Sequence, residues 1–143
     1  MTTTATTARE RMLLAKAASR SIGLLGDSAK REALRGIADA IEAAAPEIVA
    51  ANADDLRRGS ETGLSTALQD RLRLDEPRVL SLASAVRDIA ALPDPVGRVL
   101  DERTLDNGVS LTKVAVPFGV VGSIYEARPN VTVDIAALAL RSG

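Results

Sequence analysis

The sequence has 143 residues, of which 46% are hydrophobic and 26% are charged, and its formal net charge is -1. This length and composition predict one globular domain, or a piece of a larger one, and indicate neither disorder nor a nucleic-acid partner. Because the chain has no cysteine and no histidine, thiolate nucleophiles, imidazole bases and metal sites built from those side chains are excluded from it.

The first 92 residues are predicted to be helical. Ala8 opens a first segment with apolar residues at helical spacing, and Asp27 or Ser28 caps a second. Pro46 suits the first position of a third helix, which runs to about Arg58 and is expected to stop at the following glycine. The apolar stripe of the second helix consists of Leu34, Ile37, Ala38 and Ile41.

Two further helices are predicted before a proline-rich break. Ser65 caps a short helix, and Asp75 with Pro77 begins a longer one. Pro93 and Pro95 end the helical half, because proline lacks a backbone donor and restrains its neighbour. The stripe of the longer helix consists of Val79, Leu82, Ala83, Val86, Ile89 and Ala90.

A β-hairpin is predicted next. Residues 98–105 and 109–118 flank the turn at 106–108, whose Asn-Gly pair between apolar-alternating runs is a strong hairpin signal. The alternation changes parity after Leu111, which predicts a bulge or a bend near Thr112 and Lys113.

The last 25 residues have the pattern of an α/β unit. The apolar run 120–125 is typical of a strand covered on both faces, and a helix that is apolar around most of its circumference is predicted from about Thr132 to Arg141. A returning parallel strand is not present, so we expect the N-terminal part of a longer α/β protein. The alternative is a complete helical domain with a terminal hairpin and a docked helix.

The loop 126–130 is the candidate site, because ligands bind where a parallel strand ends and the next helix begins. Free N–H groups there favour an anion, Arg128 suits carboxylate or phosphate, and Asn130 offers an amide donor to an oxyanion. The alternatives are a surface or Glu126-paired Arg128, Asn130 as a cap, and a solvated Glu126 in place of a general base. Tyr125 and Phe118 are expected in the core. Gly119 and Gly122 precede the expected strand instead of following it, so a dinucleotide fingerprint is not supported.

Residues 116–143 resemble the gamma-glutamyl phosphate reductase (glutamate-5-semialdehyde dehydrogenase) family of the aldehyde dehydrogenase superfamily, and so do residues 63–72 and 89–97. The most specific part is Tyr-Glu-Ala-Arg-Pro-Asn at 125–130. The resemblance implies an α/β fold in which N-terminal helices and a β-hairpin precede the first strand and helix of a nucleotide-binding domain, here truncated.

The resemblance also implies a reaction and site residues. A cysteine thiolate attacks gamma-glutamyl phosphate, phosphate leaves, and NADPH reduces the thioester to glutamate 5-semialdehyde. Asn130 would stabilise the oxyanion and contact substrate, and Ile124, Tyr125 and Glu126 would line the cofactor site. Arg128 would bind an acidic group of the substrate or of the cofactor. No metal is implied. The family's cysteine lies downstream, so we expect the isolated chain to have no reductase activity.

The expected organisation is a helical region at 1–95, a hairpin at 96–118 that could serve oligomerisation, and an incomplete dinucleotide-binding unit at 119–143, with the catalytic domain absent. We expect a cytoplasmic protein that forms homo-oligomers at full length and binds neither nucleic acid nor membrane. The longest nearly apolar stretch, 114–125, is shorter than the roughly 18 residues that a span requires. The alternative function is a non-catalytic helical or oligomerisation module.

Overall fold

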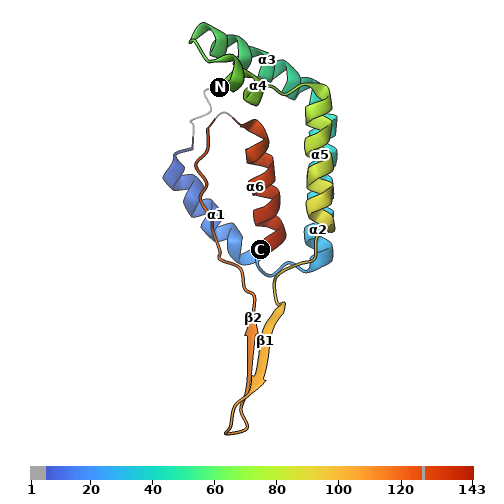
Figure 1. The fold of residues 1–143 in the computed structure, drawn as a ribbon, viewed down its shortest axis with the longest axis vertical. Coiled ribbons are helices and arrows are strands. Elements are labelled where there is room, and N and C mark those ends of the chain that lie inside the picture. The colour runs from blue at the N-terminus through green and yellow to red at the C-terminus, as the bar shows by residue number, and fades with distance from the viewer. Residues whose placement is uncertain (1–5, 127) are drawn as a thin grey trace. The chain divides into compact units, whose positions relative to one another are not determined.

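The computed structural model describes residues 6–126 and 128–143 (Figure 1). Ala127, which belongs to the predicted site loop, lies outside the described residues. The elements are α1 (Ala8–Ile22), α2 (Asp27–Ala43), α3 (Ala45–Glu61), α4 (Thr66–Leu72), α5 (Glu76–Ala91), β1 (Val99–Thr104), β2 (Ser110–Val114) and α6 (Pro129–Ser142). They form two compact units, of which one contains α1 and the hairpin and the other contains α2–α5 and most of α6.

Helix α1 begins with a capping box. The Thr7 hydroxyl accepts a hydrogen bond from the backbone N–H of Glu10 at 3.2 Å, and the Glu10 carboxylate accepts one from the backbone N–H of Thr7 at 2.8 Å. The hydrogen bonds from Thr7 lower the pKa of Glu10. Within the described residues no side chain of α1 is buried, so local capping rather than core packing defines its start.

The hairpin confirms the predicted turn. Val99 pairs with Val114 and Thr104 pairs with Ser110 in an antiparallel ladder. Gly108 has a φ of +84°, a left-handed conformation that glycine adopts without steric cost, and the side chain of Asn107 accepts a hydrogen bond from the N–H of Val109 at 3.1 Å. These turn residues set the register of the two strands.

The predicted irregularity near Lys113 is confirmed, but the extra residue lies in β1, opposite the step from Lys113 to Val114 in β2. The register shifts between Val99 and Asp101, while Thr112 pairs regularly with Glu102. Every residue of both strands is exposed. Because neither face is buried, the apolar alternation does not indicate which strand has the extra residue.

The second unit has a small core between α2, α5 and α6. The predicted stripes of α2 and α5 supply most of it, although Ile37 is 41% exposed. Two helices distant in sequence, α2 and α5, thus lie side by side (Figure 1), and their side chains pack together. The buried cluster consists of Leu34, Ala38, Ala83, Val86, Ala90 and Ala137.

The predicted caps of α4 and α5 are confirmed, whereas Asp27 and Ser28, predicted as alternative caps of the second helix, both lie inside α2. Ser65 accepts a hydrogen bond from the N–H of Leu68 at 3.4 Å, and Asp75 accepts one from the N–H of Arg78 at 3.0 Å. The predicted end of the third helix is wrong, because Gly59 remains helical. Helix α3 ends after Glu61, and the first left-handed residue beyond it is Gly63, with a φ of +79°.

The predicted strand at 120–125 is not formed. Residues 115–126 have no regular secondary structure, and Val121, Ile124 and Phe118 are exposed, Phe118 by 99%. A strand needs a neighbour for its backbone N–H and C=O groups, and within the described residues the only ladder is that between β1 and β2. Helix α6 does form and begins earlier than predicted, at Pro129, which suits a first helical position.

None of the helices in the described part of the chain has the length and apolar character needed to cross a bilayer.

An ion-pair network joins α2 to α5. The guanidinium of Arg87 donates to both oxygens of Glu42, at 2.5 and 2.8 Å, and to Asp39 at 2.6 Å. The hydrogen bonds with Glu42 and Asp39 raise the pKa of Arg87, and the hydrogen bonds from Arg87 hold the pKa of Glu42 below its ordinary value of 4.5.

This network predicts an acid-dependent loss of stability. Because the folded state lowers the pKa of Glu42, its contribution is complete above pH 4.5 and declines as pH falls through the lowered value. We therefore expect the melting temperature of the wild type to exceed that of Glu42→Gln at neutral pH and to converge on it in acid. Thermal unfolding of both proteins from neutral pH to about pH 3 measures this difference. A difference that does not change with pH would contradict the prediction.

Candidate functional site

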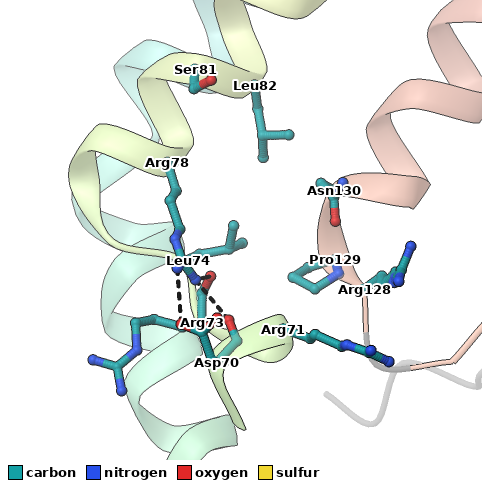
Figure 2. A pocket seen from close by; sticks show the side chains of 10 residues that line it. All are labelled: Asp70, Arg71, Arg73, Leu74, Arg78, Ser81, Leu82, Arg128, Pro129 and Asn130. Atoms are coloured by element: carbon teal, nitrogen blue, oxygen red, sulfur yellow. Dashed lines mark hydrogen bonds and ion pairs between the residues drawn. The ribbon is translucent and has the colours of Figure 1, made fainter. Parts of the chain in front are cut away.

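A pocket of about 370 Å³ lies within the second unit, between the α4–α5 region and the start of α6 (Figure 2). Its volume is in the range of small-molecule sites. The end of α4 and the first half of α5 form one wall, and residues 128–130 form the other. The pocket is lined by Asp70, Arg71, Arg73, Leu74, Arg78, Ser81, Leu82, Arg128, Pro129 and Asn130.

A buried asparagine holds the first wall in place. Asn52, on α3, is 4% exposed, and its side-chain amide donates to the carbonyl oxygen of Leu72 at 2.9 Å. Its side-chain oxygen accepts a hydrogen bond from the N–H of Leu74 at 2.7 Å. The backbone between α4 and α5 is therefore bonded to Asn52 on both sides of Arg73. These bonds fix the position of Arg73 and of nearby Arg71.

Arg78, on α5, forms hydrogen bonds to the same wall of the pocket. Its guanidinium donates to the carbonyl oxygens of Asp70 and Arg73, at 2.7 and 3.0 Å, and to the Asp70 carboxylate at 2.9 Å. The dashed lines of Figure 2 mark these contacts. These three hydrogen bonds hold Arg78 to the pocket wall and give it a structural role there.

The other wall is the first turn of α6. Pro129 is the first residue of the helix, and the N–H of Val131 donates to the carbonyl oxygen of Arg128 at 3.1 Å. Asn130 therefore lies inside the first turn, one residue past the helix start, and lines the pocket with Arg128. The end of the helix that faces this pocket is the positive end of its dipole.

The pocket is strongly basic. Four arginines and a single carboxylate line it, and Arg78 is paired with that carboxylate. Among the residues that the structure describes, none forms a hydrogen bond or an ion pair with the side chain of Arg71, Arg73 or Arg128. The alternative in which Glu126 neutralises Arg128 is therefore not what the structure shows. This charge favours an anionic ligand.

Of the predicted site residues, Arg128 and Asn130 meet in this pocket, whereas Ile124, Tyr125 and Glu126 lie outside it and are exposed. The Tyr125 hydroxyl is hydrogen-bonded to that of Thr132. The prediction that Tyr125 and Phe118 belong to the core is wrong, because both side chains are exposed where the strand has not formed.

Sequence reasoning missed the arginines of the opposite wall. Arg71, Arg73 and Arg78 follow one another at short spacing in a stretch with Leu72 and Leu74, which is the only signal that the sequence carries for them. The described residues contain no cluster of three or more side chains suited to a metal ion.

Curated proteins similar to this chain include gamma-glutamyl phosphate reductases of several bacteria. The chain is 56% identical over 142 residues to the gamma-glutamyl phosphate reductase of Leifsonia xyli subsp. xyli, a match that covers 99% of the chain and 34% of that protein. It is 58% identical over 129 residues to that of Kineococcus radiotolerans, covering 90% of the chain and 30% of that protein. The chain thus spans about a third of the length of these relatives. No family model matches it.

Solved structures agree with the sequence matches. The gamma-glutamyl phosphate reductase of Thermotoga maritima is 34% identical, with a TM-score of 0.88 over 94% of this chain and 32% of that one. The enzyme of the same name from Saccharomyces cerevisiae is 34% identical, with a TM-score of 0.87 over 95% of this chain and 35% of that one. By sequence and by fold, the chain is similar to gamma-glutamyl phosphate reductases and matches about one third of their length.

Proposed function

We propose that the chain forms part of an NADPH-dependent reductase that converts gamma-glutamyl phosphate to glutamate 5-semialdehyde and phosphate in proline biosynthesis. The observation that supports this most directly is the placement of Asn130 in a basic pocket, within a chain 56% identical to a relative named for that substrate. The reductase name of the relatives supports a nicotinamide cofactor, and NADPH is the finer proposal.

Asn130 is the residue of this chain that acts at the reacting carbonyl. Its side-chain amide would donate a hydrogen bond to the oxyanion that forms when a nucleophile attacks the acyl carbon. The dipole of α6 adds positive potential at the same place. The nucleophilic thiolate must come from outside these 143 residues, because they contain no cysteine.

The proposed cofactor contacts are Ile124, Tyr125 and Glu126. All three are exposed, so their side chains are accessible to a bound nicotinamide cofactor. The hydrogen bond between Tyr125 and Thr132 ties this segment to the first turns of α6. When bound, the cofactor would supply the hydride that reduces the acyl group.

A chimaera tests the proposed function. This chain would replace the matching third of the Leifsonia xyli relative, and the product would be expressed in a bacterium that lacks its own reductase. We expect growth without added proline, as with the intact relative. A chimaera that is expressed and folded but does not support growth would contradict the proposal.

A second candidate function is self-association through the hairpin. The strands are exposed on both faces, including the apolar side chains of Val99, Leu111 and Val114, and their free edges can pair with another copy. We expect light scattering to detect oligomers of the wild type and a shift towards monomers for Leu111→Lys. Equal masses for the two proteins would argue against this contact.

A further inference from the structure

Two arginines on opposite walls of the pocket, Arg71 and Arg128, have no partner among the described residues. Arg78 donates to Asp70 and Arg73, whereas no described residue bonds to the side chain of Arg71 or Arg128. Figure 2 shows Arg71 extending from the end of α4 towards the wall that carries Arg128, while Arg73 points away from that wall. The pocket therefore presents two free guanidinium groups from two different segments.

Such an arrangement is suited to one kind of ligand. Two like charges that face a shared pocket repel each other unless an anion lies between them. A guanidinium presents a planar fork of donors that matches the oxygens of phosphate or carboxylate. Two forks and two positive charges match a phosphoryl dianion better than the single charge of a carboxylate.

We propose that Arg71 and Arg128 bind the phosphoryl group of the substrate, or inorganic phosphate after the reaction, next to Asn130. This assignment rests on the proposed function, because Asn130 then marks the position of the reacting carbonyl. In an acyl phosphate a single bridging oxygen separates the phosphorus from that carbonyl carbon. The phosphoryl group must therefore lie close to Asn130, and the two free guanidinium groups line the same pocket.

Phosphate binding to the chain itself is the first test. Inorganic phosphate would be titrated into the 143-residue protein at low ionic strength, with binding followed by calorimetry or by the shift in melting temperature. We expect Arg71→Gln and Arg128→Gln each to weaken phosphate binding about 10-fold, and Arg71→Lys to restore part of it. Arg57→Gln, on α3 and outside the pocket, removes the same charge from an exposed arginine and is the matched control, with unchanged binding.

A second titration, with L-glutamate, distinguishes a phosphate site from a carboxylate site. L-Glutamate has a carboxylate like that of the substrate and no phosphoryl group. If it bound as tightly as phosphate and with the same dependence on Arg71, the site would be a carboxylate site, and the phosphoryl assignment would be overturned. Equal weakening by all three glutamine variants would also overturn it, because it would show general electrostatic attraction without a defined site.

The chimaera separates this inference from the proposed function. In the reverse direction the reaction consumes phosphate, so Arg71→Gln should raise the KM for phosphate about 10-fold with little change in kcat. An active chimaera in which Arg71→Gln leaves that KM unchanged would refute the phosphoryl site and leave the function standing. An inactive chimaera, with phosphate bound through Arg71 and Arg128 in the chain, would refute the function and leave the anion site.

Discussion

Replacing Asn130 with alanine in the chimaera is expected to lower kcat by about 100- to 1,000-fold, the usual effect of removing one oxyanion donor. Asn130 lies in the first turn of α6 and lines the pocket, so its amide can be directed at a carbonyl bound there. The oxyanion exists only after nucleophilic attack, and the loss should therefore fall on kcat more than on the KM for the semialdehyde. Steady-state kinetics of the chimaera and of its Asn130→Ala variant measure both constants.

Arg73→Gln in the same chimaera is the control for this prediction. Arg73 lines the same pocket but points away from the α6 wall, so its replacement should leave kcat nearly unchanged. If Asn130→Ala retained most of the wild-type kcat, Asn130 would not be the oxyanion donor. If it changed the KM for phosphate without affecting kcat, its role would be in binding.

The second large effect concerns stability. Leu34→Ala is expected to lower the free energy of unfolding of the chain by about 2–5 kcal/mol, because it empties a fully buried site. Leu34 is the largest apolar member of a cluster that otherwise consists mainly of alanines. With so few large side chains in the core, neighbouring residues have little means of filling the space. Urea denaturation followed by circular dichroism measures the change.

Ile37→Ala provides the matched control on the same helix. Ile37 is 41% exposed, so its replacement by alanine leaves no closed cavity. Alanine also has a high helix propensity. Ile37→Ala should therefore lower the free energy of unfolding by much less than Leu34→Ala does. Equal losses for the two variants would show that the core is not packed as described.

Much of the helical unit could be predicted from the sequence because its signals are local. Ser65 and Asp75 begin helices at the positions where their side chains accept backbone hydrogen bonds. The Asn107–Gly108 turn likewise depends only on the conformations of adjacent residues. The family resemblance, carried most specifically by residues 125–130, is confirmed by relatives at 56% and 58% identity.

The predictions that failed depend on contacts distant in sequence. The apolar run at 120–125 has strand character, but a strand is completed by its neighbour, and within the described residues none lies beside it. Phe118 and Tyr125 are exposed for the same reason. The bulge was assigned to the wrong strand because an exposed hairpin has no buried face to set the parity.

One of the two walls of the candidate site could be predicted from the sequence. Arg128 and Asn130 lie where a loop meets the start of a helix, and that junction is a local feature of the sequence. Arg71 reaches the same pocket because Asn52, on another helix, bonds to both Leu72 and Leu74. No spacing rule connects Asn52 to residue 130, so that wall became visible only in the folded chain.

The most direct test of the account is the reverse reaction of the purified chimaera. With glutamate 5-semialdehyde and NADP+, we predict that NADPH forms only when inorganic phosphate is present, with one phosphate consumed for each NADPH produced. A dependence on phosphate distinguishes formation of an acyl phosphate from simple oxidation of an aldehyde to an acid. The assay therefore tests the identity of the substrate as well as the transfer of hydride. NADPH formation at the same rate without phosphate, or none at all from a folded protein that binds NADP+, would contradict the account.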